Sequence, residues 1–157
     1  MDEKITLGPS SDGMKEAIKL GRDAALETGH TTIGLDDLLI GILRSQSGAG
    51  AGLIGALAGD LQKIEQSVRR APDARSSEDE VEIDGNAPIT LGSVLLTSSA
   101  ESAVKRAYEE AFTRRKSEVG TEHLLLSILQ DESNQVTRTL ANSGITYQSV
   151  KAAIDGQ

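Results

Sequence analysis

The chain has 157 residues, 38% of them hydrophobic, which is enough for one hydrophobic core or two small ones. Its 16 basic and 24 acidic residues give a formal net charge of −8, and its only aromatic residues are Tyr108, Phe112 and Tyr147. Long-range repulsion and the lack of stacking rings argue against nucleic acid as a partner. The absence of cysteine excludes disulfides, thiolate metal sites and cysteine nucleophiles.

The sequence carries no sign of membrane insertion or export. No apolar run approaches the roughly 18 to 20 residues of a membrane span. The first residues, Met1 to Lys4, lack the basic start and apolar stretch of a signal peptide. We therefore expect a cytoplasmic protein without membrane contact.

An internal repeat organises the chain at an offset of 86 residues. Without a gap, residues 14–44 align with residues 100–130, and 8 of these 31 positions are identical. The identities are mainly apolar and fall at helical spacing, so two unrelated amphipathic helices could share some of them. The common glycine turn at Gly34 and Gly120, followed by the same apolar stripe, favours duplication.

Copy one, residues 11–70 after an N-terminal tail (1–10), has the pattern of four helices. Ser11 and Asp12 are start signals for the first helix, which we expect to end at Gly29. A second helix follows Gly34, and a short third one lies in the glycine-rich segment around residues 53–57. Asp60 is placed to cap the fourth.

An acidic linker, residues 71–92, separates the copies. It has six acidic residues and one basic residue, which is five of the eight excess negative charges of the chain. Asp84-Gly85 lies between two alternating stretches, 80–83 and 89–91, and this pattern is typical of a hairpin. Since an isolated two-stranded ribbon is marginal in water, a loosely docked linker is the favoured alternative. We expect residues 73–85 to be dispensable for folding.

Copy two, residues 93–157, repeats the plan. Helices are expected over about 99–115, 121–130 and 136–141, followed by one that Thr146 caps. We expect Thr121 to cap its helix with its hydroxyl, while Glu122 adds negative charge to the first turn. Copy one has Leu35 at the position of Thr121, so Gly34 or Asp36 should supply its cap. The expected fold is therefore all-α: two tandem four-helix repeats joined by the linker.

No pattern of residues in the sequence supports catalysis. A phosphate-binding loop is missing, because the glycines of residues 48–52 are not followed by lysine and serine or threonine, so we expect no binding or hydrolysis of ATP. These glycines are typical of a loose loop rather than an anion site. The two histidines, His30 and His123, lack the spacing of metal ligands, and we expect neither a metal nor another cofactor. For His123 a partly buried polar contact is favoured over a catalytic role.

Two kinds of charged cluster have simple structural explanations. Neighbouring carboxylates, Asp36-Asp37 and Glu109-Glu110, point about 100° apart on a helix and so favour solvated surface or helix-start charge over catalysis. The basic run from Arg114 to Lys116 suits the negative end of a helix, although it could also contact the acidic linker or form a patch that binds phosphate or a partner.

Three segments carry a resemblance to a known family. The glycine turn of copy two continues as GTEHLLL, that of copy one as GLDDLLI, and the latter follows AALETGH at residues 24–30. Over residues 11–155 the chain resembles the Clp amino-terminal repeat domain, and the long inter-repeat segment looks most like ClpC-type AAA+ unfoldases. The resemblance implies an all-helical, pseudo-two-fold, non-catalytic module that docks adaptors and protein substrates for AAA+ modules and a Clp peptidase.

The resemblance also implies a binding site. In ClpC-type members the acidic residue of each such motif helps to hold the guanidinium of phosphorylated arginine. That residue is Glu122 in copy two, with Thr121 beside it, and Asp36 in copy one. Glu122 could equally serve only to stabilise its helix start. Because Asp36 is shorter and stands next to Leu35, we expect the Glu122 site to bind more strongly.

Two other functions remain as alternatives at this stage. One is a free-standing regulator or adaptor of a protease complex. The other, weaker one is a hydrolase that uses a carboxylate pair. A phosphate-binding loop encoded beyond Gln157 would favour the unfoldase.

Overall fold

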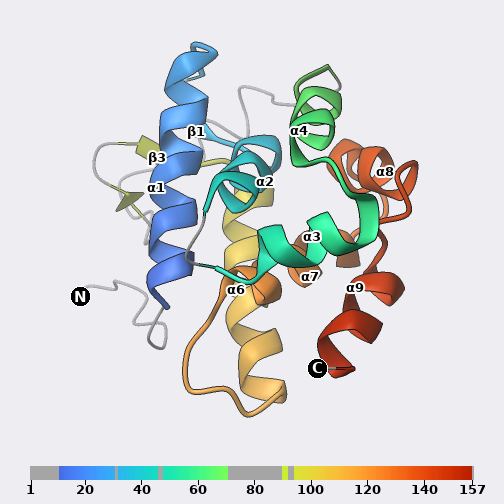
Figure 1. The fold of residues 1–157 in the computed structure, drawn as a ribbon. Helices are drawn as coiled ribbons and strands as arrows, with labels where there is room; N and C mark the ends of the chain where they lie inside the picture. The colour runs from blue at the N-terminus through green and yellow to red at the C-terminus, as the bar shows by residue number, and fades with distance from the viewer. Residues whose placement is uncertain (1–10, 31, 46–47, 71–89, 92–93, 157) are drawn as a thin grey trace, which may run out of the picture.

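The computed structural model describes residues 11–30, 32–45, 48–70, 90–91 and 94–156 (Figure 1). The N-terminal tail and most of the acidic linker, with the Asp84-Gly85 turn, lie outside the described residues. The regular elements among these residues are eight helices and three short strands. None of these described helices has the length and apolar character needed to cross a membrane.

Copy one forms four helices at the expected places. They are α1 (Asp12–Glu27), α2 (Leu35–Arg44), α3 (Gly50–Ala58) and α4 (Leu61–Arg70). The Ser11 hydroxyl accepts the Met14 N–H at 3.0 Å, and the Asp60 carboxylate accepts the Gln62 N–H at 3.0 Å. Gly29 has φ 79°, so the chain leaves α1 through a left-handed residue. The predicted start and stop signals are thus confirmed.

Copy two repeats these helices as α6 (Ser98–Thr113), α7 (Thr121–Gln130), α8 (Gln135–Ala141) and α9 (Tyr147–Asp155). Three of the four begin 86 residues after their counterparts in copy one, and α8 begins one residue earlier than that spacing would give. Thr97 caps α6 and Thr146 caps α9, each by accepting an N–H three residues on at 3.1 Å. The predicted register of the repeat therefore continues beyond the aligned segment.

A small three-stranded sheet joins the two copies, in the order β1–β3–β2. Strand β3 (Val94–Leu96) pairs in parallel with β1 (Thr32–Ile33) and antiparallel with β2 (Thr90–Leu91). Residues 90–91 of the second alternating stretch are therefore extended, but their partner here is β3, just beyond them in sequence. Strands of two or three residues are too short to show a periodic pattern, which is why β1 and β3 escaped prediction.

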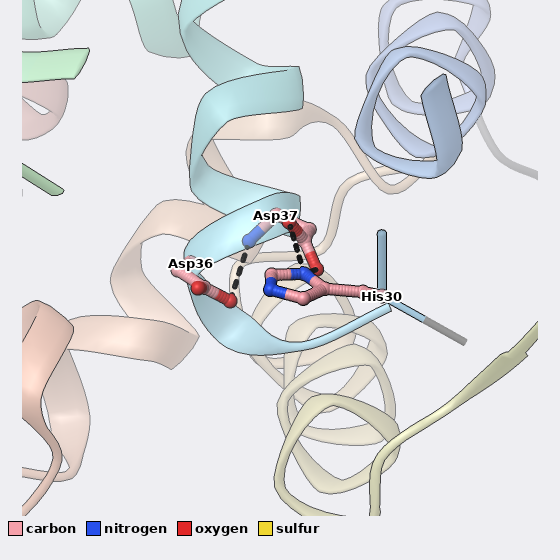
Figure 2. A group of neighbouring side chains, drawn as sticks. All are labelled: His30, Asp36 and Asp37. Atoms are coloured by element: carbon pink, nitrogen blue, oxygen red, sulfur yellow. Dashed lines mark hydrogen bonds and ion pairs between the residues drawn. The ribbon is translucent and has the colours of Figure 1, made fainter. Parts of the chain in front are cut away.

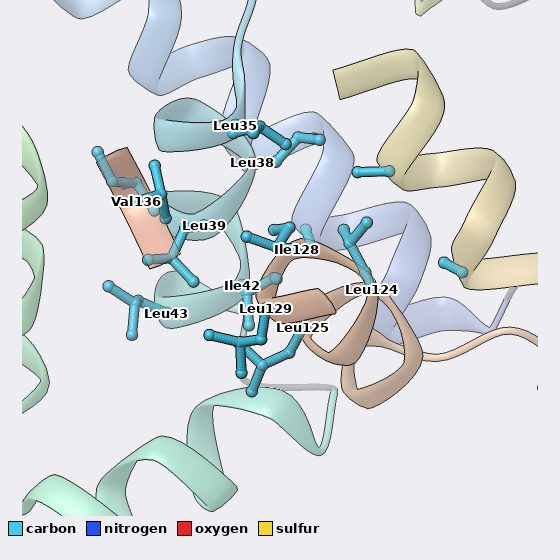
Figure 3. Packing of buried hydrophobic residues seen from close by; sticks show 14 of the residues in the cluster. Leu35, Leu38, Leu39, Ile42, Leu43, Leu124, Leu125, Ile128, Leu129 and Val136 are labelled. Atoms are coloured by element: carbon cyan, nitrogen blue, oxygen red, sulfur yellow. The ribbon is translucent and has the colours of Figure 1, made fainter. Parts of the chain in front are cut away.

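The core lies between the two copies, on the apolar faces of α2 and α7. Figure 3 shows side chains of both helices converging in its centre. The predicted inward positions of α2 are all buried, and so are their counterparts on α7. These are Leu38, Leu39, Ile42 and Leu43 on α2 and Leu124, Leu125, Ile128 and Leu129 on α7. One core therefore serves both repeats.

The contacts between the copies come in symmetry-related pairs. Helix α3 contacts α7 as α8 contacts α2, and α1 contacts α7 as α6 contacts α2. Two backbone hydrogen bonds repeat the pattern: the Ser11 N–H donates to the Val119 carbonyl at 2.9 Å, and the Thr97 N–H donates to the Ile33 carbonyl at 3.0 Å. The expected all-α fold of two tandem repeats in a pseudo-two-fold arrangement is confirmed, with the small sheet as an addition.

Candidate functional site

Helix α7 begins at a glycine turn that a histidine closes. Gly120 is the N-cap residue and Thr121 is the first helical residue. The Nδ1 atom of His123 accepts the Gly120 N–H at 2.9 Å, so the third helical residue reaches back to the cap. The prediction that Thr121 caps this helix is wrong, because the glycine before it already occupies the cap position.

The Thr121 side chain instead fastens copy one to copy two. It is fully buried, and its hydroxyl accepts the Gly50 N–H at 2.7 Å. A side chain on Gly48 or Gly50 would collide with the Thr121 side chain. The glycine-rich segment is therefore not simply a loose loop: these two glycines let its backbone approach the start of α7.

A cavity of about 340 Å³ lies at this helix start, and both copies contribute to its wall. Ser11, Gly48 and Ala49 come from copy one, whereas copy two provides Lys116, Ser117, Glu118, Gly120, Glu122 and His123. The Glu122 carboxylate lies over Gly120, since a methyl group on that glycine would collide with it. A cation, a carboxylate and an imidazole thus share one cavity at the positive end of a ten-residue helix.

His123 is a hydrogen-bond donor at the wall of this cavity. Because its Nδ1 accepts the Gly120 N–H, the neutral ring carries its proton on Nε2. This Nε2 is buried and has no hydrogen-bond partner among the residues that the structure describes. Burial lowers the pKa of His123 below its ordinary value of 6.5 and so favours the neutral ring. The expected partly buried polar contact is confirmed, and the ring is almost fully buried.

The counterpart in copy one has the same three positions and different chemistry (Figure 2). His30, Asp36 and Asp37 stand 86 residues before Lys116, Glu122 and His123. The Asp37 carboxylate lies 3.0 Å from His30 Nδ1 and accepts the Gly34 N–H at 3.1 Å. The Asp36 carboxylate accepts the Asp37 N–H at 2.9 Å. In copy one, therefore, carboxylates of the chain itself use the N–H groups at the helix start.

Asp36 and Asp37 are 3% and 1% exposed. Their place at a helix start agrees with one half of the prediction for this pair, but they are not solvated surface. With His30 they offer three ligand atoms within 4.8 Å of one another, a donor set of the kind that transition metals bind. The hydrogen bonds of Asp37 give a sufficient reason for the arrangement, because they tie the α2 cap together.

In the basic run after α6, Arg114 is paired, whereas Arg115 and Lys116 have no ion-pair partner among the described residues. Arg114 donates to Glu110 at 3.2 Å and to Asp155 at 2.9 Å, and Tyr147 also donates to Glu110 at 3.0 Å. Glu110 is therefore not the solvated charge predicted for it, since its side chain is only 13% exposed. Helix α6 ends at Thr113, two residues before the expected end, and Arg115 takes the left-handed φ of 60°.

The sequence singled out Glu122 and Asp36 as candidates but not the charged residues that lie near them. Lys116 and His30 were not linked to either helix start, although the offset of 86 pairs them. A comparison of the polar residues on the two sides of each glycine turn would have indicated which of them could meet at the helix start. Asp37 and His123 share the capping position in the same way.

Comparisons with known proteins agree with this architecture. The family model of the Clp repeat (R) N-terminal domain matches residues 95–157. The chaperone protein ClpB of Oceanobacillus iheyensis and the negative regulator of genetic competence ClpC/MecB of Bacillus subtilis are each 24% identical over 150 residues, which is 96% of this chain. The chain spans only 17% of the length of each of these relatives.

Solved structures of low sequence identity share the fold. The N-terminal domain of the chaperone ClpD from Arabidopsis thaliana has a TM-score of 0.64 at 17% identity, covering 97% of this chain and 96% of that one. The Hsp104 N-terminal domain from Candida albicans has a TM-score of 0.65 at 17% identity, covering 92% and 87%. The family match shows a Clp repeat N-terminal domain over residues 95–157, and the relatives and solved structures extend the similarity over copy one.

Proposed function

We propose that this domain is a non-catalytic docking module that binds adaptors and protein substrates for a Clp-type ATP-dependent unfoldase and its peptidase. We propose further that the start of α7 holds phosphorylated arginine, with Glu122 as the residue that pairs with the guanidinium. The observation that supports this best is the cavity at α7, which combines groups for both halves of that ligand.

Phosphoarginine carries a phosphoryl group on one nitrogen of its planar guanidinium. A phosphate needs cations and N–H donors, which Lys116 and the first turn of α7 supply. A guanidinium needs a carboxylate that can accept two parallel hydrogen bonds, and Glu122 supplies it in the same cavity.

The proposed asymmetry between the copies has a structural basis. In copy two the helix-start carboxylate belongs to a partly exposed residue on a cavity wall. In copy one Asp36 is buried and accepts the Asp37 N–H. A phosphate would have to displace this carboxylate from the N–H group. The Glu122 site is therefore proposed as the stronger one, and Thr121 as the residue that holds copy one against it.

Calorimetric titration with an arginine-phosphorylated protein tests the proposal. Glu122→Gln keeps the shape of the side chain and removes its charge, and Asp36→Asn is the matched change in copy one. A charge-assisted hydrogen bond contributes about 1.5 to 3 kcal/mol, so Glu122→Gln should weaken binding about tenfold or more. The Asp36→Asn variant should bind nearly as the unmutated domain does.

Two controls make the result specific. The same protein without phosphorylation, and one phosphorylated on serine, separate recognition of the whole group from attraction to phosphate alone. Thermal melts establish that both variants remain folded. Equal losses from the two variants would refute the asymmetry, and absence of binding by the unmutated domain would refute phosphoarginine as the ligand.

A further inference from the structure

A large apolar side chain is exposed to solvent at the end of α6. Phe112 is the only phenylalanine of the chain and is 83% exposed, whereas the apolar side chains on the inner face of α6 are buried. The residue 86 positions earlier, Leu26, is 58% exposed at the end of α1. Both copies thus expose an apolar residue at the same position of the repeat.

Phe112 borders a cavity of about 570 Å³ that two cations share. The other lining residues are Thr113, Arg115, Lys116 and Ser117. Arg115 and Lys116 are exposed, and within the described part of the chain neither has an ion-pair partner, in contrast to the doubly paired Arg114. In a chain with a net charge of −8, this corner therefore presents two positive charges next to an aromatic ring, and neither is paired within the described residues.

The backbone conformation of Arg115 also supports a binding role for its side chain. Arg115 has φ 60°, a left-handed conformation that costs a residue with a Cβ more than it costs glycine. The equivalent residue of copy one is Gly29, with φ 79°. Copy two keeps an arginine where the turn favours glycine, and the arginine points to a use outside the fold.

This cavity adjoins the one at α7, because Lys116 and Ser117 line both. We propose that Phe112, Arg115 and Lys116 form a docking groove for an extended protein segment in which an acidic side chain neighbours an aromatic or aliphatic one. The apolar side chain packs on Phe112, and the acidic one pairs with Arg115. The proposal rests on the proposed function only in taking a protein segment as the ligand, and it needs no phosphoarginine.

Charge selects this occupant. An apolar segment without acid would use Phe112 and leave the two cations without a partner, while a basic segment would be repelled by them. The combination of an exposed aromatic ring with arginine is also typical of interface residues that contribute most to binding. The small ring area and the two charges fit a short segment rather than a broad interface.

Fluorescence anisotropy with labelled peptides tests the groove. The probe is a short peptide with phenylalanine between two glutamates. Two control peptides replace its glutamates by glutamine or its phenylalanine by serine. The domain should bind the probe, and each control peptide should bind about tenfold more weakly or worse, because both the apolar and the charged contact are needed.

Four variants locate the binding. Phe112→Ala should weaken it about tenfold or more, while Leu26→Ala, the matched change in copy one, should alter it less than about twofold. Arg115→Gly keeps the turn and should weaken binding several-fold, about three- to tenfold, whereas Arg115→Lys keeps the charge and should restore most of it. Because Phe112 and Arg115 are exposed, all four variants should remain folded in thermal melts.

The outcomes separate this inference from the proposed function. Equal losses from Phe112→Ala and Leu26→Ala, or equal binding of all three peptides, would overturn the groove. A self-association seen by sedimentation and abolished by Phe112→Ala would also overturn it, since a second copy would then be the occupant. Probe binding that depends on Phe112 but is unchanged in Glu122→Gln supports the groove even if phosphoarginine fails to bind.

Discussion

The two copies share one arrangement of helices, but different side chains make the equivalent contacts between them. Helices α1 and α6 both have 16 residues, and α2 and α7 both have ten. In copy one Gly41 lies against the α1 backbone, where a side chain would collide with the Ala17 carbonyl. In copy two the equivalent Ser127 donates a hydrogen bond to the Ala103 carbonyl, the counterpart of Ala17. The close backbone contact between α1 and α2 is therefore replaced by a side-chain hydrogen bond between α6 and α7.

The ion pairs also differ between the copies: the helix that carries the basic residue in one copy carries the acidic residue in the other. In copy one Arg69 of α4 donates to Glu27 at the end of α1 at 2.9 Å. In copy two Arg114, just after α6, donates at 2.9 Å to Asp155, which stands 86 residues after Arg69. The same two helix ends are bridged with opposite signs. What the duplication preserved is the place of a contact rather than the residues that make it.

Placing the residue of one copy at the equivalent position of the other, at Gly41 and Ser127, should have the largest effect on stability. Gly41→Ser puts the side chain of copy two into copy one, where its Cβ would overlap the Ala17 carbonyl and lie about 2.8 Å from the Gly21 nitrogen. Backbone on both sides prevents relief, so the free energy of unfolding should fall by about 3 kcal/mol or more. Urea denaturation measures it.

The reverse change is the control. Ser127→Gly removes one hydrogen bond and adds a glycine to a helix, which together should cost about 1 to 2 kcal/mol. Equal losses from the two exchanges would show that the helix pairs are separated alike, contrary to the structure.

The contact between α3 and α7 should come next. Thr121→Val keeps the shape of the side chain and deprives the buried Gly50 N–H of its acceptor, at a cost of about 1 to 3 kcal/mol. Thr113→Val, at an exposed position, should change stability by less than about 0.5 kcal/mol. A neutral effect of Thr121→Val in chemical denaturation would mean that the Gly50 N–H finds another partner.

The two copies cap their second helix with different residues, Asp37 and His123, so exchanging them should change how stability depends on pH. Burial lowers the pKa of His123 below 6.5, so the unfolded chain takes up a proton first as the pH falls. Stability from the neutral ring is complete above pH 6.5 and is lost as the pH falls through the lowered pKa. Protonation also removes the acceptor of the Gly120 N–H.

His123→Asp introduces the capping residue of copy one and should flatten the dependence of stability on pH between about 7 and 5. Hydrogen bonds from Arg44 and Arg114 lower the pKa of Glu27 and Asp155 below 4.5 and 3.8, so these two carboxylates contribute little to the slope in this range. Urea melts at several pH values measure the slope. An unchanged slope in the variant would assign the effect to another group.

The smallest effect should be a gain. Arg115→Gly restores the residue that copy one has at the left-handed turn and should stabilise the domain by about 0.5 to 1 kcal/mol. The matched change Gly29→Ala should destabilise it by about 1 kcal/mol, although there is open space around that position. If both changes are neutral, the two turns differ from the backbone described above.

Helix positions were predictable because each helix carries its own start signal and apolar stripe. The spacing of 86 residues located copy two, and Ser11, Asp60 and Thr146 marked helix starts that the structure confirms. Thr121 misled because threonine suits both a cap and the first turn, and only the preceding glycine decides between them.

The surroundings of the candidate site were less predictable, because they depend on contacts between distant segments. Thr121 meets Gly50 across 71 residues, and nothing local in either segment indicates that contact. The burial of Asp36 and Asp37 also ran against the usual exposure of carboxylates. Phe112 carries no signal in the sequence that separates an exposed aromatic residue from a core one.

The reciprocal hydrogen bonds of Ser11 and Thr97 bear on the order in which the chain becomes structured during synthesis. The ribosome releases copy one first, yet the Ser11 N–H finds its acceptor only at Val119, in the turn of copy two. The apolar face of α2 likewise waits for α7 to cover it. Copy one therefore emerges as an incomplete unit with exposed leucines, and the domain becomes fully folded only after α7 has left the exit tunnel.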